Sequence, residues 1–283
     1  MLDALLSEDL LPGETARPVR LIAAMRHAVL AGGKRLRPFL LIEAARLLGR
    51  EDEGVLRAAA ALECVHCYSL VHDDLPAMDD DDIRRGQPTV HRAFDEATAI
   101  LAGDALLTFA FDLLADPATD EDPELRSMLV LDLARASGLG GMAGGQMLDL
   151  LGVAVSKAED QIRRLQSMKT GALIRFATRA GARMGGGSAA DVERLTRFGE
   201  IVGLAFQLAD DLLDVIGDAD ALGKATGKDA DLGKATLVGL HGVEWTRKTL
   251  AELVAEADGL LAPYGERADM LRQTARFIAD RDS

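Results

Sequence analysis

Residues 189–216 read AADVERLTRFGEIVGLAFQLADDLLDVI. Apolar residues recur in this stretch at helical spacing and no proline interrupts it, so it predicts one long helix. The chain around it follows the same pattern: alanine and leucine are abundant, β-branched runs are short, and no proline lies between Pro123 and Pro263. No Asn-Gly or Asp-Gly turn separates two alternating apolar runs, the usual sign of a β-hairpin. The sequence therefore predicts an all-α protein.

Prolines and glycines divide the helical pattern into ten segments, and no change of composition marks a linker between them. We therefore expect one large helical domain over residues 1–283. Its helices are predicted near residues 17–31, 37–49, 53–74, 90–115, 123–136, 140–151, 157–184, 189–216, 234–260 and 265–281.

The charge of the chain excludes some partners. Its formal net charge is -14 and its isoelectric point is near 4.8, so the phosphate backbone of a nucleic acid would be repelled. An acidic protein that handles phosphates needs metal ions or locally gathered lysines and arginines. No basic start precedes an apolar run at the N-terminus, and no uncharged apolar stretch of about 18 residues appears. We therefore expect no signal peptide, no membrane span and a cytoplasmic protein.

The two cysteines, Cys64 and Cys67, form a C-x-x-C motif. A redox or metal site would need a βαβ context or a second pair of ligands, and neither is visible. We expect two small buried residues on a helix.

An aspartate cluster lies inside the long helix of residues 189–216. Asp210 and Asp214 are four residues apart, so on a helix they lie about 6 Å apart along the axis and on one face, with Asp211 beside them. Carboxylates at that spacing repel each other unless a cation lies between them. Magnesium suits this arrangement, because it commonly takes one or two carboxylates plus substrate phosphates.

A second, denser cluster occupies residues 73–82, where six carboxylates fall within ten residues. Pro76 disfavours helical geometry at the residue before it, so the preceding helix should end near Asp74. The chain must then loop before Asp79 can face back toward Asp73. One such run alone favours a solvated acidic loop, and the spacing and lack of glycine exclude an EF-hand. Two clusters, each at the end of a similar apolar helical run, favour a metal site instead.

Basic residues gather in this acidic chain as well. Each alone is more often a surface charge, but together with the aspartates they describe a diphosphate held by metals and cations. His66, seven residues before Asp73, lies on nearly the same helix face and either donates to a diphosphate or satisfies a core hydrogen bond. We expect the other histidines to be structural. The basic groups are Lys34, Arg35 and Arg37 after Gly32-Gly33, then Arg84-Arg85, Lys169 before Thr170, and Lys224, Lys228 and Lys234.

On these residues the chain resembles the trans-polyprenyl diphosphate synthases, of the bacterial farnesyl type. The resemblance covers nearly the whole chain from residue 20 on, and the paired aspartate motifs with two arginines are highly specific. It departs at Leu237-Val238, where the family often has Tyr-Pro, and in a short N-terminal region. The matching stretches are residues 32–38, 68–86, 100–106, 144–149, 169–174, 203–214, 223–224 and 233–234.

The resemblance implies a homodimer of isoprenoid-synthase-type bundles, each around a central cavity, and small isoprenoid diphosphates as substrates. It implies magnesium as cofactor, three ions with the bound diphosphate, with manganese as an alternative. The metal ligands would be Asp73, Asp79 and Asp210, supported by Asp74 and Asp214. The allylic diphosphate would be gripped by Arg84, Lys169, Thr170, Gln207 and Lys224, and Lys234 would also bind substrate. Isopentenyl diphosphate would bind Lys34, Arg37, His66 and Arg85.

Product length is implied by the residues before the first cluster. In the family the positions of Tyr68 and Ser69 shape the floor of the tail pocket, so a bulky tyrosine predicts a fifteen-carbon product. The alternative is that Tyr68 is ordinary core. Other readings of the whole chain also stay open. They are a geranylgeranyl or geranyl diphosphate synthase, a terpene cyclase, a noncatalytic regulatory subunit of such a synthase, and a plain calcium-binding module.

Overall fold

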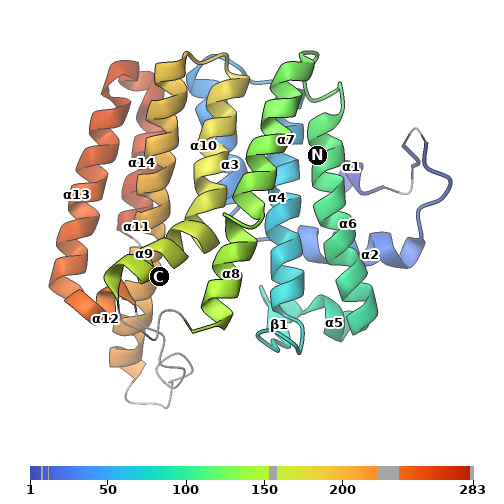
Figure 1. Ribbon diagram of the computed structural model, residues 1–283, viewed down its shortest axis with the longest axis horizontal. Coiled ribbons are helices and arrows are strands. Elements are labelled where there is room, and N and C mark those ends of the chain that lie inside the picture. Colours follow the sequence, from blue (N-terminus) through green and yellow to red (C-terminus); the bar gives the residue numbers. More distant parts are fainter. Residues whose placement is uncertain (8, 12, 153–157, 222–235, 281–283) are drawn as a thin grey trace. The chain divides into compact units, whose positions relative to one another are not determined.

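The computed structural model describes residues 1–283 except 8, 12, 153–157, 222–235 and 281–283 (Figure 1). Helices make up nearly all of the regular structure in the described residues, so the all-α prediction is confirmed. The chain divides into two compact units, which are described separately. Unit 1 comprises residues 1–42 and 51–130, and unit 2 comprises residues 43–50 and 131–283. The prediction of a single domain over residues 1–283 stays a prediction.

Unit 1 is built around α4 (Glu53–Asp73), which packs along α6 (Glu96–Ala115). Each of these helices begins at an aspartate cap: the carboxylate of Asp52 accepts the Val55 N–H at 3.0 Å, and that of Asp95 accepts the Thr98 N–H at 2.7 Å. The other elements wholly inside unit 1 are α1 (Leu2–Leu5), α2 (Val19–Leu30), β1 (Ile83–Arg84), β2 (Gln87–Pro88) and α5 (Val90–Ala93).

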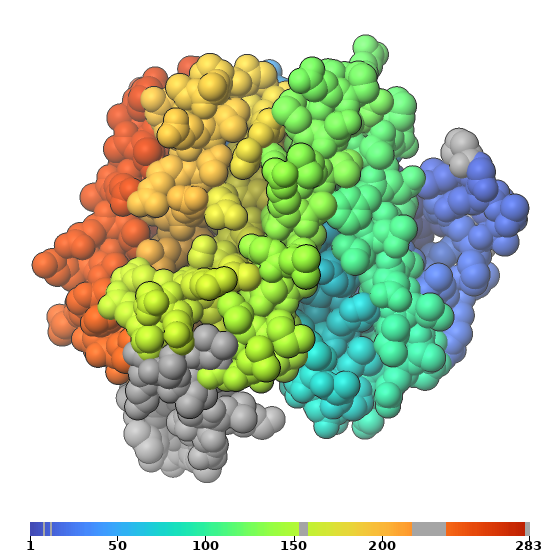
Figure 2. All heavy atoms as spheres, viewed as in Figure 1, coloured from blue at the N-terminus to red at the C-terminus, as the bar shows by residue number. Residues whose placement is uncertain are grey.

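In the N-terminal part of unit 1, α2 lies against α6 (Figure 2). Leu6 is buried, and Arg26 of α2 bonds the carboxylate of Asp3 in the short α1. The sequence analysis predicted no helix before residue 17, so α1 is an addition. Its four residues are too few to show an apolar helical period.

Unit 2 is a helical bundle in which α10 (Ala172–Met184) packs on α11 (Ala189–Ala221). Gly199 and Gly203 of α11 allow this close approach, because a Cβ at Gly199 would lie 2.3 Å from Thr178 Oγ1 and one at Gly203 3.1 Å from Gly171 Cα. Two helices are shared between the units, α3 (Leu36–Leu47) and α7 (Pro123–Ser137). The rest of unit 2 is α8 (Met142–Leu150), α9 (Glu159–Gln166), the π-turn η2 (Ser167–Gly171), α12 (Leu237–His241), α13 (Val243–Leu261), the 3₁₀ segment η4 (Ala262–Ala268) and α14 (Asp269–Ala279).

Three of the predicted helices are interrupted. The segment predicted at 90–115 breaks before Asp95, which caps α6. The segment predicted at 157–184 contains the π-turn, a feature that often marks functional sites. The part of the 234–260 segment that the structure describes breaks at Gly242, where φ is 84°.

A two-stranded hairpin was not predicted from the sequence. Ile83 pairs with Pro88 and Arg84 with Gln87, across a turn formed by Arg85 and Gly86. Both turn residues have positive φ, 53° and 75°, as a type I′ turn requires. The usual sequence sign of such a turn is Asn-Gly or Asp-Gly. Here the first position is Arg85, so this sign of a hairpin is missing from the sequence.

Among the helices of the described residues, α4 and α6 are long and apolar enough to cross a membrane by length and composition alone. Within the protein, 72% of the apolar window of α4 is buried, against 39% of that of α6. Arg57 of α4 also donates from Nη2 to Asp116 Oδ2 at 2.7 Å, an internal ion pair inside unit 1. We therefore interpret α4 as a core helix.

Candidate functional site

The first aspartate cluster begins where α4 ends. The helix stops at Asp73, as Pro76 predicted, and the Asp74 N–H still donates to Leu70 O at 3.0 Å. The chain then turns back, so that the Asp79 N–H donates to Asp73 O at 2.8 Å. This contact brings Asp79 to the end of the helix beside Asp73, the return that the spacing of the carboxylates had predicted.

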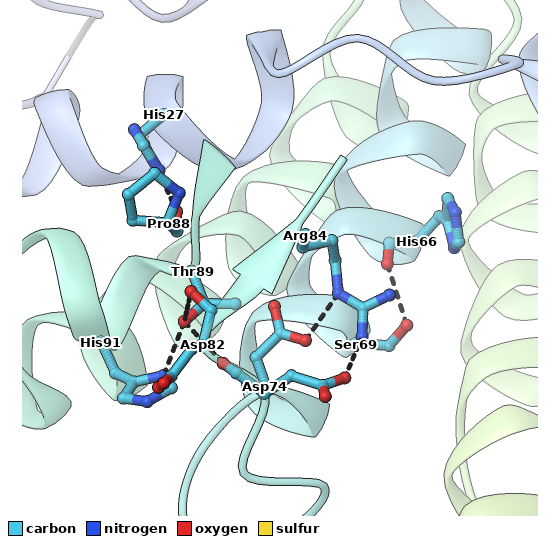
Figure 3. A network of polar contacts seen from close by, with 10 residues as sticks. His27, His66, Ser69, Asp74, Asp82, Arg84, Pro88, Thr89 and His91 are labelled. Carbon is cyan, nitrogen blue, oxygen red and sulfur yellow. Dashed lines mark hydrogen bonds and ion pairs between the residues drawn. The ribbon is translucent and has the colours of Figure 1, made fainter. Parts of the chain in front are cut away.

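Asp74 lies in a different environment from Asp79. It is 3% exposed, and its Oδ1 accepts a hydrogen bond from Arg84 Nε at 2.6 Å (Figure 3). Arg84 Nη2 also reaches Asp81 Oδ2 at 3.3 Å. Burial raises the pKa of Asp74, while the hydrogen bond from Arg84 opposes that rise. Asp74 thus holds Arg84 in place at the foot of the hairpin.

The glycine loop after α2 carries a second group of cations in unit 1. Arg35 forms an ion pair with Glu63, whose side chain is 1% exposed, and also donates to the carbonyl of Val29. Arg85 Nη1 donates to Gly32 O at 2.6 Å. Its guanidinium lies against Gly33, where φ is 114°, a backbone conformation that favours glycine.

His66 and Arg37 belong to the same charged neighbourhood. Burial lowers the pKa of His66 well below its ordinary value, and the charges of Arg37 and Arg85 lower it further. His66 is therefore neutral near pH 7 and keeps one N–H to donate. Burial lowers the pKa of Arg37 as well, and its Nε is buried without a hydrogen-bond partner in the described part of the chain. Lys34 lies exposed on the same loop.

Backbone strain coincides with these segments. Among the described residues, those other than glycine with positive φ are Arg35 at 49°, Asp80 at 51° and Arg85 at 53°. Each such residue costs of order 1–3 kcal/mol, and such residues cluster at functional sites. All three belong to the aspartate and arginine segments that the sequence analysis had singled out.

The second aspartate cluster lies on α11 in unit 2. Asp210 and Asp214 are exposed one helical turn apart, whereas Asp211 is 7% exposed. The carboxylate of Asp211 accepts two amide hydrogen bonds, from Gln207 Nε2 at 2.8 Å and from Gln166 Nε2 at 2.9 Å. Burial raises the pKa of Asp211 to about 6, against the lowering effect of these hydrogen bonds.

The π-turn supplies two further predicted residues in unit 2. Thr170 Oγ1 donates to Gln207 Oε1 at 3.0 Å, so these two predicted ligands of the diphosphate lie together. Lys169 Nζ donates to Asp149 Oδ2 at 2.6 Å. Gly145 of α8 lies against the turn, where a Cβ would be 2.3 Å from the backbone nitrogen of Lys169. Lys224 and Lys234, which were also predicted to bind substrate, lie outside the described residues.

Three polar residues at the site were not predicted as site residues: Glu63, Asp149 and Gln166. Asp149 ends a stretch that carries the family resemblance, which was a usable signal. Nothing in the local sequence indicates that Gln166 would reach Asp211 or that Glu63 would be buried against Arg35, because both partners are distant along the chain.

Tyr68 and Ser69 occupy the last turns of α4. Tyr68 is 9% exposed, and its ring packs edge-on against that of His72 with centroids 5.8 Å apart. Burial, followed by the charge of Asp73, raises the pKa of Tyr68. Ser69 Oγ donates to His66 O at 2.8 Å. Both residues therefore lie one to two turns behind the first aspartates, as their numbering implied.

The four histidines expected to be structural all hydrogen-bond within the protein, His241 Nε2 with Glu159 Oε2 at 2.9 Å. His72 hydrogen-bonds with Ile100 O at 3.1 Å, His27 with Pro88 O at 2.7 Å, and His91 with Thr89 Oγ1 at 3.1 Å. Cys64 and Cys67 are buried free thiols on α4, as predicted. Burial raises the pKa of Cys67 to about 12, so it stays protonated.

The donor set determines which metal would fit. Within the described ranges, no group of three or more histidine, cysteine, aspartate or glutamate side chains is arranged to hold a metal ion. The exposed carboxylates Asp79, Asp210 and Asp214 and the half-buried Asp73 are hard oxygen donors. They fit magnesium, which keeps several waters and takes substrate phosphates as ligands, and they do not fit a metal caged by protein alone.

Comparison with known proteins gives one family throughout. The model of the polyprenyl synthetase family matches residues 18–260. The chain is 45% identical over 270 residues to farnesyl diphosphate synthase of Escherichia coli, covering 92% of this chain and 89% of that protein. It is 42% identical to the large subunit 1 of the heterodimeric geranylgeranyl pyrophosphate synthase of Arabidopsis thaliana, covering 94% and 73%.

Solved structures agree with the sequence relatives. An FPP/GFPP synthase from Zymomonas mobilis superposes with a TM-score of 0.83 at 42% identity, covering 98% of this chain and 93% of that one. A geranyltransferase from Legionella pneumophila gives a TM-score of 0.85 at 34% identity, covering 99% and 92%. With this fold, these motifs and a family model that matches most of its length, the chain belongs to the polyprenyl synthetase family.

Proposed function

We propose that the protein is a magnesium-dependent farnesyl diphosphate synthase, which condenses isopentenyl diphosphate with dimethylallyl or geranyl diphosphate. Its membership of a prenyltransferase family supports the reaction class. The observation that carries the proposal is the return of the chain after α4, which puts Asp79 beside Asp73 through a 2.8 Å hydrogen bond. With the two residues side by side, their carboxylates would supply hard oxygen ligands to a metal that also binds a diphosphate.

In this proposal the allylic diphosphate is the leaving group. Magnesium, when bound at Asp73, Asp79 and Asp210 with Asp74 and Asp214 in support, supplies charge neutralisation for the departing oxygens. Arg84, fixed by Asp74 at 2.6 Å, contributes a positioned positive charge. Lys169 and Gln207 contribute donors in unit 2, and the hydroxyl of Thr170 donates to Gln207 Oε1 and so fixes that amide. The allylic C–O bond then ionises to a carbocation without a protein nucleophile.

Isopentenyl diphosphate is the second substrate. Arg37 contributes a positively charged guanidinium, Arg85 is fixed on Gly32, and the neutral His66 keeps an N–H to donate. These groups, with Lys34, bind its diphosphate and orient its double bond toward the carbocation. After the double bond attacks, a proton is lost to the departed diphosphate.

A geranylgeranyl diphosphate synthase is the second candidate, because such enzymes are also close relatives. The chain is 41% identical to the geranylgeranyl pyrophosphate synthase of Capsicum annuum. The two candidates share every catalytic motif and differ in the depth of the tail pocket. The buried ring of Tyr68 favours the shorter, fifteen-carbon product. A homodimer in the cytoplasm is part of the proposal.

Product analysis tests the proposal directly. Purified protein is incubated with magnesium, isopentenyl diphosphate and either dimethylallyl or geranyl diphosphate, and the dephosphorylated alcohols are identified by mass. We expect farnesol as the dominant product. Geranylgeraniol or longer alcohols would support the proposed reaction class and contradict the proposed fifteen-carbon product. No condensation by folded protein with metal present would point to the noncatalytic regulatory subunit.

A further inference from the structure

Gln166, the last residue of α9, is a buried amide next to the second aspartate cluster. It is 8% exposed, and its Nε2 donates to Asp211 Oδ2 at 2.9 Å. Its Oε1 is buried and has no hydrogen-bond partner in the described part of unit 2. Gln166 also lines a cavity of about 310 Å³ with Ser167, Arg175 and Glu200.

Because Oε1 of Gln166 is buried without a partner in the described part of unit 2, fold stability alone does not account for a glutamine at this position. Burial of an acceptor without a partner costs free energy, and a methionine of similar length would avoid that cost. Local rules of this kind are broken mainly at functional sites. The feature that requires an amide at this position is therefore its N–H group, which is directed at Asp211.

Through hydrogen bonds, Asp211 connects Gln166 to two residues of the proposed site, Gln207 and Thr170. One carboxylate oxygen accepts from Gln166 and the other accepts from Gln207 Nε2 at 2.8 Å. The amide of Gln207 is thereby oriented, with Nε2 toward Asp211 and Oε1 toward the hydroxyl of Thr170 at 3.0 Å. An amide nitrogen carries two hydrogens, so Gln207 retains one N–H for a phosphate oxygen.

We propose that Gln166 is a positioning residue for the allylic diphosphate, acting through Asp211 on Gln207 and Thr170. This inference rests on the proposed function. The hydrogen bond from Gln166 fixes the orientation of the Asp211 carboxylate, and the fixed carboxylate keeps the amide of Gln207 from flipping. Without it, the amide can present its oxygen to the diphosphate in place of an N–H group.

Kinetics of three variants test the inference. Gln166→Met removes the donor, and Gln166→Glu places a second carboxylate against Asp211. We expect each to raise the KM for the allylic diphosphate about tenfold, equivalent to about 1.4 kcal/mol, and to leave the KM for isopentenyl diphosphate unchanged. The double variant Gln166→Glu/Asp211→Asn reverses donor and acceptor, because the new amide at position 211 can donate to the new carboxylate at position 166 and still accept from Gln207. It is expected to recover most of the lost affinity.

Ser167→Ala is the matched control, since Ser167 lines the same cavity and is the next residue. Equal loss of affinity for both substrates, an equal effect in the control, or no recovery in the double variant would each overturn the inference. Calorimetric binding of inorganic diphosphate with magnesium, and thermal unfolding of each variant, are measured alongside. An inactive wild-type protein would refute the proposed function, whereas an active wild type with an unaffected Gln166→Met variant would refute this inference alone.

Discussion

At the scale of the residue, the two clusters place chemically identical side chains in opposite environments. Asp210 is exposed, while its neighbour Asp211 is buried and holds two amides. Asp79 is exposed, while Asp74 is buried against Arg84. In each cluster the exposed carboxylates are open to solvent, whereas the buried ones are already held by hydrogen bonds. The motif letters alone do not separate these environments.

Tyr68 provides the sharpest test of product length. Tyr68→Ala removes a ring that is almost fully buried at the end of α4, so a longer chain has room to grow. We expect products longer than fifteen carbons, measured by mass after dephosphorylation. Tyr68→Phe keeps the ring and is expected to keep the product. An unchanged product distribution in Tyr68→Ala would show that Tyr68 is ordinary core.

Asp211 is expected to make stability depend on pH. Its pKa is raised from 3.8 to about 6 in the folded protein, so the folded state binds more protons than the unfolded state between those values. Stability from this group is therefore present below about pH 4 and lost as the pH rises through about 6. A shift of about two pKa units corresponds to up to about 3 kcal/mol.

The measurement compares denaturant unfolding of the wild type with that of Asp211→Asn, without metal, from pH 4 to pH 7. The difference in unfolding free energy between the two proteins should change across this range. A constant difference would contradict a raised pKa at Asp211.

At the scale of the element, the π-turn and α8 form a close contact. Gly145 lies so near the turn that a Cβ would be 2.3 Å from Lys169 N, and the turn carries both Lys169 and Thr170. The extra residue of a π-turn shifts the facing of the side chains that follow it. The packing of α8 therefore affects the direction in which Lys169 and Thr170, two proposed ligands of the diphosphate, point.

Gly145→Ala tests this link. A methyl group there must push α8 away from the turn, so we expect destabilisation of about 1–3 kcal/mol, typical of overpacking, together with reduced turnover. Gly259→Ala in α13 is the control, because nothing lies within 4 Å of its Cβ. That variant is expected to gain about 0.4–1 kcal/mol from helix propensity. Equal stability of the two variants would refute the close contact, as measured by thermal unfolding.

At the scale of the whole molecule, each unit carries an acidic cluster together with positively charged residues. Unit 1 contains Arg84 and the glycine-loop arginines, and unit 2 contains Lys169. No protein-only metal cage occurs in the residues that the structure describes. Under the proposed function, metal and diphosphate are expected to bind in a mutually dependent way, since each supplies ligands to the other.

Thermal unfolding with added ligands measures this dependence. We expect magnesium alone to raise the melting temperature little, and magnesium with inorganic diphosphate to raise it clearly, because only the pair binds tightly to the folded state. Removal of the metal by a chelator should abolish both the shift and turnover. An equal shift from metal with and without diphosphate would favour the plain calcium-binding module.

By itself, the sequence determined the helical class, the end of α4 near Asp74 and the positions of both aspartate clusters. These features are local, since helical spacing and Pro76 act within a few residues. Only the tertiary structure decided that Arg84 lies on Asp74 and that Asp211 is held by Gln166, 45 residues away in the chain. The first contact requires the hairpin to fold back onto the end of α4, and the second requires α9 and α11 to come together, so helical spacing alone predicts neither.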